Sequence, residues 1–94
     1  MQFALVAHDR PNSVALRMAI RPEHLKHLDS LGEQLLLAGP FLNDSGEGVG
    51  SIVVITAASL DEARELFSRD PFVTQGLFDS ITIKPWKLTI NKLT

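Results

Sequence analysis

The most informative segment of the chain runs Gly50-Ser51-Ile52-Val53-Val54-Ile55-Thr56. Its centre is β-branched and continuously apolar, which is typical of a strand covered on both faces. Because successive side chains of a strand point to opposite faces, residues 52–55 place two large apolar side chains on each face. The pattern predicts a central strand of a sheet, with other parts of the protein packed against both of its sides.

Three further strands are predicted around this segment. The apolar run of residues 2–8 ends at a turn rich in Pro, Asn and Ser, and residues 43–48 form another turn of Asn, Asp, Ser and Gly. Before that second turn, residues 35–42 are predicted to form a strand that bends at Gly39. Near the end of the chain, residues 77–89 alternate in polarity and predict a fourth strand, interrupted near Pro85.

The region between the first two strands has the spacing of a helix. It covers residues 14–33, with Ser13 as the predicted N-cap and Gly32 near the end. Pro22 removes an amide donor and disfavours helical geometry at the preceding residue, so we expect two helical pieces or one kinked helix. The predicted buried stripe consists of Val14, Met18, Leu25, Leu28 and Leu31.

A second helix is predicted to begin at Ser59, which has the spacing of a capping box with Glu62. In that motif the Ser59 hydroxyl accepts from the Glu62 amide, and the Glu62 carboxylate reaches back to the Ser59 amide. Asp70-Pro71 ends the helix, and a short irregular or single-turn segment follows as far as Gly76. The apolar stripe of this helix consists of Leu60, Ala63, Leu66 and Phe67.

The predicted order of elements is β-α-β-β-α-β, the ferredoxin-like arrangement of the α+β class. Two helices then cover one face of a four-stranded antiparallel sheet. We expect a second subunit to cover the opposite face, which makes the protein a homodimer or a higher oligomer. With 45% hydrophobic and 21% charged residues, the chain is expected to form one domain over residues 1–94, with a C-terminal tail over residues 89–94.

Composition excludes several classes of function. Nine Lys and Arg against eleven Asp and Glu give a net charge of −2, so no basic field attracts nucleic acid or an anionic membrane. The absence of Cys excludes disulfides, thiolate metal sites and a thiol nucleophile. His24 and His27 have no identifiable third ligand, so we expect no metal and no cofactor. No apolar run is long enough to span a bilayer, and we expect a cytoplasmic protein.

Six separated motifs give the chain a family resemblance. They are Arg17, Arg21-Pro22-Glu23-His24-Leu25, Leu37-Ala38-Gly39-Pro40, Gly50-Ser51, Asp70-Pro71-Phe72 and Ile83-Lys84-Pro85-Trp86. In this order and spacing, residues 1 to about 88 resemble the YCII-related (YciI-like) family of small dimeric α+β-barrel proteins. The resemblance implies two ferredoxin-like subunits packed sheet to sheet, a cleft lined by His24 and Asp70, and acid–base chemistry of the lyase or isomerase kind. The short loop over residues 43–48 and the His8 that precedes Asp9 differ from some relatives and leave the substrate open.

His24 and Asp70 are the candidate catalytic pair. An imidazole can accept or donate a proton near neutral pH, and a carboxylate can fix its tautomer and stabilise its charged form. From the residues alone, His24 is equally a helix-surface histidine, and Asp70 an N-cap of the following turn. As a cleft residue, His24 is expected to contribute little packing. Ser51 lies in no Gly-x-Ser-x-Gly motif, so we expect no nucleophilic catalysis.

Five residues are candidates for binding a small-molecule substrate: Arg17, Arg21, Gly39, Pro40 and Ser51. The two arginines lie four residues apart and could clamp a substrate carboxylate, or form a solvated basic edge paired with Asp or Glu. Gly39 and Pro40 offer bare backbone that lines a pocket or shapes it. One functional hypothesis is a cofactor-independent enzyme for proton transfer, elimination or isomerisation on a small, for example carboxylated, organic molecule. The other is a non-catalytic module that binds a metabolite or another protein.

Overall fold

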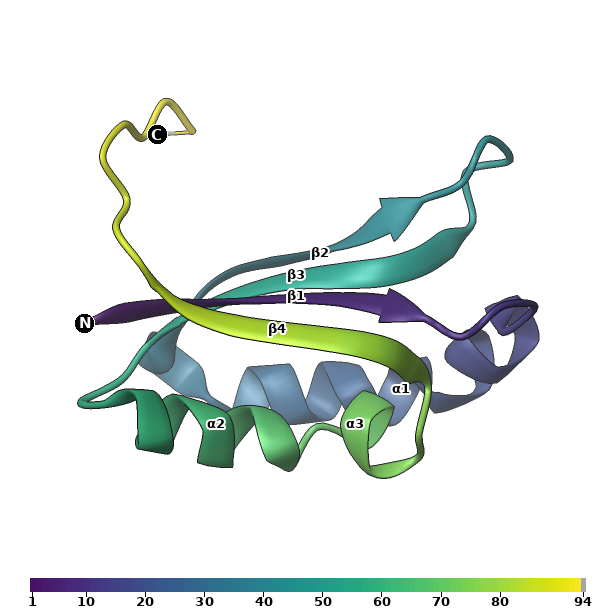
Figure 1. Ribbon diagram of the computed structural model, residues 1–94, viewed down its shortest axis with the longest axis horizontal. Coiled ribbons are helices and arrows are strands. Elements are labelled where there is room, and N and C mark those ends of the chain that lie inside the picture. Colours follow the sequence, from purple (N-terminus) through teal and green to yellow (C-terminus); the bar gives the residue numbers. More distant parts are fainter. Residues whose placement is uncertain (94) are drawn as a thin grey trace.

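The computed structural model describes residues 1–93 and contains the predicted βαββαβ order with two additional short helical turns (Figure 1). The strands are β1 (Gln2–Asp9), β2 (Leu35–Leu42), β3 (Gly48–Thr56) and β4 (Phe78–Trp86). The helices are α1 (Val14–Ser30), the 3-10 turn η1 (Gly32–Gln34), α2 (Leu60–Ser68) and α3 (Pro71–Thr74). All neighbouring strands pair antiparallel, in the order β2-β3-β1-β4. The ferredoxin-like α+β fold is confirmed, with β3 in a central position.

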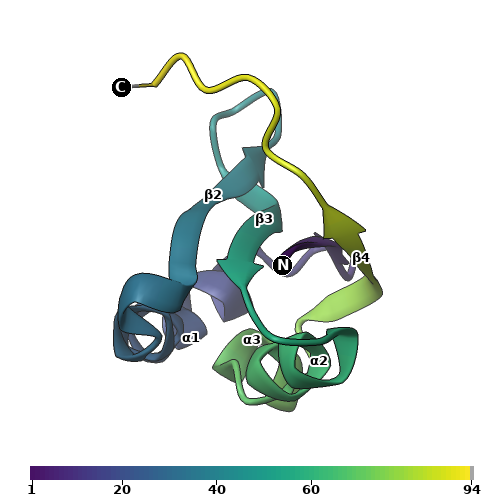
Figure 2. The ribbon, with the colours of Figure 1, turned by 90° about the vertical axis from the view of Figure 1, so that its left-hand side faces the viewer.

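The helices lie together on one face of the sheet, as Figures 1 and 2 show from two directions. The alternating side chains of β1 and β3 that point toward the helices form the main core with α2, made of Phe3, Leu5, Ala7, Val53, Ile55, Ala63 and Phe67. A smaller cluster of Ile20, Phe72 and Leu77 packs beside it. This second cluster joins α1 to the short helix α3, and it thereby brings the start of α3 against the middle of α1.

The opposite face of the sheet also buries apolar side chains of β3, as the sequence predicts. Val54 is 2% exposed and pairs with Ala4 of β1 and Leu37 of β2. Ile52, two residues earlier on the same face, is half-buried. The residues after β4 pass over this face (Figure 2), where the Leu88 amide donates to Gln2 Oε1 at 2.9 Å. Thr94, the last residue of the predicted tail, lies outside the described residues.

Helix α1 differs from its predicted form in two ways. It is one continuous helix through Pro22, so the prediction of two separate pieces is wrong. Pro22 lies on the exposed side, where water can bind the carbonyl that the missing amide leaves free. The predicted apolar stripe is confirmed at Leu28 and Leu31, which are buried, and wrong at Met18 and Leu25, which are 59% and 43% exposed. The buried positions of α1 are Arg17, Ile20, His24 and Leu28.

Four smaller features also differ from their predictions. Ser13 stands at the N-cap of α1, but its hydroxyl donates to the Pro11 carbonyl and caps nothing. In the capping box of α2, the Glu62 amide donates to Ser59 Oγ at 3.1 Å, whereas the Glu62 carboxylate accepts from the Ala58 amide. The register irregularities of β2 fall near its two ends and not at Gly39. Strand β4 ends at Trp86, before the predicted Thr89.

Among the helices of residues 1–93, none has the length and apolarity that crossing a membrane requires.

Candidate active site

His24 and Asp70 come from different elements and meet in the interior. His24 lies in the middle of α1, and Asp70 lies at the junction of α2 and α3, 46 residues later. The His24 Nδ1 atom is 2.7 Å from Asp70 Oδ2 and 2.9 Å from Oδ1. Both residues are buried, with 7% and 6% of their surface exposed. The structure therefore brings together the two residues that the sequence selected as a pair.

Asp70 also serves as the N-cap of α3. Its Oδ1 atom accepts from the Phe72 amide at 2.9 Å, and Pro71 occupies the first position of the helix, where no amide is needed. The capping role that the sequence offered as an alternative is therefore present alongside the contact with His24. As a carboxylate, Asp70 can only accept hydrogen bonds, so Nδ1 of His24 carries a hydrogen, and in the neutral form of the ring Nε2 keeps a free lone pair.

Phe72 fixes the plane of the His24 ring. The two rings stack with centroids 3.9 Å apart and an interplanar angle of 14°. The Arg17 guanidinium carbon lies 4.5 Å from the centroid of the same Phe72 ring, which is fully buried. With its ring held by Phe72 and Nδ1 held by Asp70, the His24 imidazole has little freedom to rotate. Sequence reasoning missed this role of Phe72, although Phe72 follows Asp70-Pro71 directly.

Arg17 is held by the protein itself. Its Nε and Nη2 atoms donate to the two carboxylate oxygens of Asp9, at 2.7 and 3.0 Å, and Nη2 also donates to Ser51 Oγ at 2.8 Å. Only 4% of Arg17 is exposed, so it forms no solvated edge. Asp9 was missed as a site residue, but the sequence holds a signal for it. The odd-numbered residues of β1 face the helices, and continuing that alternation from Ala7 places Asp9 on the same face.

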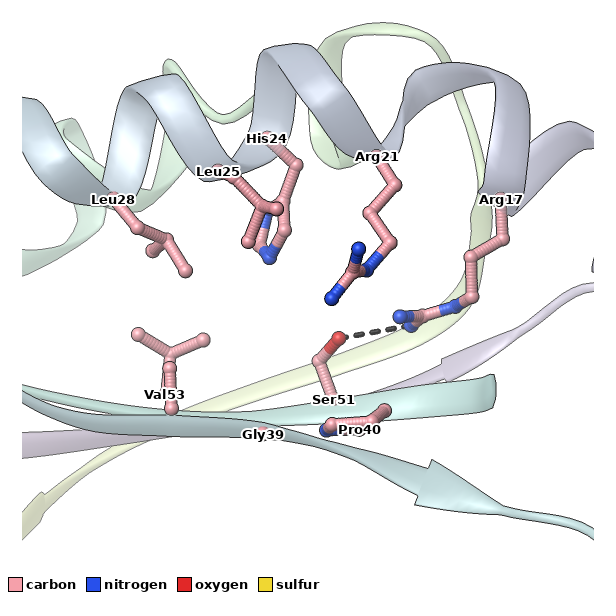
Figure 3. Close-up of a pocket in the computed structure, with 10 residues that line it drawn as sticks. Arg17, Arg21, His24, Leu25, Leu28, Gly39, Pro40, Ser51 and Val53 are labelled. Carbon is pink, nitrogen blue, oxygen red and sulfur yellow. Dashed lines mark hydrogen bonds between the residues drawn. The ribbon is translucent and has the colours of Figure 1, made fainter. Parts of the chain in front are cut away.

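A cavity of about 130 Å³ opens between α1 and the strands β2 and β3 (Figure 3). Its walls include the predicted residues Arg17, Arg21, His24, Gly39, Pro40 and Ser51, together with the apolar residues Leu25, Leu28, Ala38 and Val53. Asp70 does not line the cavity and contacts it only through His24. The apolar residues of the cavity wall were not predicted as site residues. The sequence pattern of a helix or strand shows that a residue is apolar, but not that it lines a cavity.

The cavity presents groups that differ in chemical character. The His24 ring reaches from α1 toward the sheet in Figure 3, and its Nε2 atom makes no hydrogen bond with any residue of 1–93. Arg21 is exposed and extends toward the sheet beside it. Within the described residues, no group of three His, Cys, Asp or Glu side chains is arranged to hold a metal ion. The arrangement can accept or deliver a proton next to a positive charge.

Comparison with known proteins agrees with the fold and the motifs. The protein YciI of Escherichia coli O6:H1 is 34% identical over 95 residues, which cover 93% of this chain and 97% of that protein. The 5-chloro-2-hydroxyhydroquinone dehydrochlorinase of Burkholderia phenoliruptrix, solved with 2,5-dihydroxybenzoquinone, has a TM-score of 0.85 and 32% identity, covering 93% of this chain and 94% of that one. A cofactor-independent oxygenase of Streptomyces nogalater, SnoaB, has a TM-score of 0.59 at 9% identity over 99% of this chain and 96% of that one, a likeness of fold alone.

Residues 1–87 match the YCII-related domain, which spans nearly the whole chain. The match ends one residue after the last strand and includes every residue that lines the cavity. The chain therefore belongs to the YCII-related domain family.

Proposed function

We propose that the protein is a cofactor-independent enzyme that moves a proton on, or eliminates a small group from, a small organic molecule bound in the cavity. His24 is the general acid–base and Asp70 its positioning partner. The observation that carries the proposal is the state of the His24 ring, whose Nδ1 atom is held by a buried carboxylate while Nε2 faces the cavity without a protein partner. This is the arrangement that general acid–base catalysis by histidine requires.

The elementary step follows from these positions. The Nε2 lone pair takes a proton from an acidic O–H or C–H of the substrate, and the electron pair left behind enters a new π bond. In an elimination, the bond to the leaving group breaks and that group departs with its own electron pair. The imidazolium formed on His24 is stabilised by the Asp70 carboxylate at 2.7 Å. The proton then passes to solvent or returns to the product.

The dehydrochlorinase from Burkholderia supports elimination from a single hydroxylated ring as the reaction class. By its name that enzyme removes the elements of HCl from a chlorinated hydroquinone. An apolar cavity of ~150 Å³ is known to hold one benzene ring, so the cavity of about 130 Å³ found here suits a molecule of that size. The apolar walls would contact the faces of the ring, and the polar groups would orient its substituents.

The test is turnover of 5-chloro-2-hydroxyhydroquinone, followed by release of chloride. His24→Gln keeps a hydrogen-bond donor near Asp70 but removes the acid–base group, and we expect it to lower turnover by roughly 10²–10⁴-fold. His27→Gln is the matched control, because His27 lies on the same helix outside the cavity, and it should keep full turnover. If 2,5-dihydroxybenzoquinone binds but neither this substrate nor related rings are turned over, the non-catalytic binding module is the better description.

We also propose that the working form is a homodimer, with the second copy covering the open face of the sheet. Support comes from Ile52, which is only half-buried on that face, and from Trp86 at its edge, which is 42% exposed. A single chain places all its helices on the other face. A second copy that packs sheet to sheet would bury these side chains.

A further inference from the structure

The two arginines of the cavity are chemically different. The charge of Arg17 is matched by the two oxygens of Asp9, and the side chains of this pair are only 5% and 4% exposed. Arg21 lies one helical turn later and makes no hydrogen bond or ion pair with any residue of 1–93. Figure 3 shows its guanidinium in the space between α1 and the sheet, on the Ser51 side of His24. Arg21 therefore supplies the cation of this cavity that is still available to a ligand.

Ser51 has a hydrogen that is also available. Its Oγ atom accepts a hydrogen bond from Arg17 Nη2 at 2.8 Å, so the hydroxyl hydrogen of Ser51 points away from Arg17. No residue of 1–93 accepts that hydrogen, although Ser51 is only 4% exposed and lines the cavity. A hydroxyl whose oxygen accepts from a cation is polarised and becomes a better donor. Arg17 thus acts as a positioning residue, which orients Ser51 as a donor toward the cavity.

No carboxylate of the described residues accepts a hydrogen bond from Arg21 or from the Ser51 hydroxyl. Asp9 is occupied by Arg17, and Asp70 is occupied by His24 and the Phe72 amide. Neither Asp nor Glu occurs among the residues that line the cavity. The cavity therefore combines apolar walls with the donors Arg21 and Ser51 and with Nε2 of His24 as an acceptor.

We infer that the cavity selects an anionic one-ring compound, a carboxylate or a phenolate, whose charged oxygen binds Arg21 and the Ser51 hydroxyl. This inference rests on the proposed function, since it concerns the same cavity, and it adds the charge and the orientation of the substrate. With the anionic oxygen at Arg21 and Ser51, the ring lies against the apolar walls. A second substituent, or an acidic C–H, is then directed at His24.

The inference is tested with two probes of equal shape, benzoate and benzamide. Binding of each is measured by NMR titration, following the cavity amides and the His24 ring protons. We expect benzoate to bind at least about tenfold more tightly than benzamide, because charge-assisted hydrogen bonds are roughly twice as strong as neutral ones. Arg21→Gln should remove this preference. Arg64→Gln, which makes the same charge change at an exposed site on α2, should leave both affinities within about twofold.

Each other outcome has a defined meaning. Equal binding of the two probes, unchanged by Arg21→Gln, would overturn the preference for anions while leaving the acid–base site in place. Unchanged benzoate affinity in Ser51→Ala would remove the hydroxyl from the proposed anion site. If neither probe shifts the resonances of His24 or the cavity amides at millimolar concentration, the cavity does not bind single rings, and both this inference and the proposed substrate class fail.

Discussion

Replacing Asp70 by Asn separates the two roles of its carboxylate. Asn caps helices about as well as Asp, so the Phe72 amide, now at 2.9 Å from Oδ1, keeps an acceptor. The change replaces the charge-assisted bond between His24 Nδ1 and residue 70 by a neutral one. Because hydrogen bonds to charged groups contribute about 1.5–3 kcal/mol and neutral ones about 1 kcal/mol, we expect Asp70→Asn to lower the free energy of unfolding by about 1 kcal/mol.

The effect on turnover should be much larger than the effect on stability. The Asn amide can donate to Nδ1, which would place the ring hydrogen on Nε2 and remove the lone pair that faces the cavity. In another histidine-dependent enzyme, the same Asp-to-Asn change lowers the rate by about 10⁴-fold for this reason. We expect a loss of roughly 10²-fold or more here. Asp70→Ala serves as the contrast, because it also loses the cap and should lower stability by about 2–4 kcal/mol.

Three measurements on the same samples decide the case. Urea denaturation gives the free energy of unfolding, the ¹⁵N shifts of the His24 ring report its tautomer, and an activity assay gives turnover. A large fall in turnover with a changed tautomer and a small change in stability is the expected pattern. If Asp70→Asn leaves both the ¹⁵N shifts and turnover unchanged, Asp70 is a helix cap only, and the acid–base pair is refuted.

Three other substitutions test the packing around the site. A Cβ at Gly50 would lie 2.6 Å from the Ala7 carbonyl oxygen, which is backbone and cannot move cheaply, so Gly50→Ala should lower the urea midpoint by the equivalent of about 1–3 kcal/mol. Asp9→Ala leaves the buried Arg17 charge uncompensated and should cost about 3–5 kcal/mol in the same assay, whereas a loss below 1 kcal/mol would show that the pair is not structural. Val54→Asp buries an unpaired charge and should unfold the chain or cost several kcal/mol. Sedimentation should give twice the chain mass for the unmodified protein at micromolar concentration, and a well-folded monomer there would exclude the sheet-to-sheet dimer.

The fold was predictable because its main signals are local. The β-branched run of β3 and the Ser59 cap of α2 are both decided by neighbouring residues. Asp70-Pro71 likewise ends one helix and caps the next through contacts within a few residues. The errors at strand ends, such as the early end of β4 at Trp86, arise where pairing with another strand decides the outcome.

The candidate site was only partly predictable. The family resemblance pointed to His24 and Asp70, but their contact joins residues 46 positions apart, and no periodicity reports such a contact. Asp9 and Phe72 were missed because each acts by holding another side chain. The expectation that His24 packs little is contradicted by its 7% exposure and its stacking on Phe72. His24→Ala would therefore mix a loss of about 2–3 kcal/mol of stability with any loss of chemistry, which is why His24→Gln is the better test.

The apolar pattern of α1 does not predict which of its side chains are buried, because two polar side chains of the candidate site lie on the buried face of this helix. From hydrophobicity alone, Met18 and Leu25 would be expected to be buried. The helix instead exposes both and buries Arg17 and His24. Burying polar side chains is unfavourable unless each finds a partner, and here each has a carboxylate of its own. No fully buried side-chain N or O atom of residues 1–93 lacks a hydrogen-bond partner. Nε2 of His24, the Ser51 hydroxyl and Arg21 keep hydrogen-bonding capacity, and all three line one cavity, so a ligand there can satisfy groups that the fold leaves unpaired.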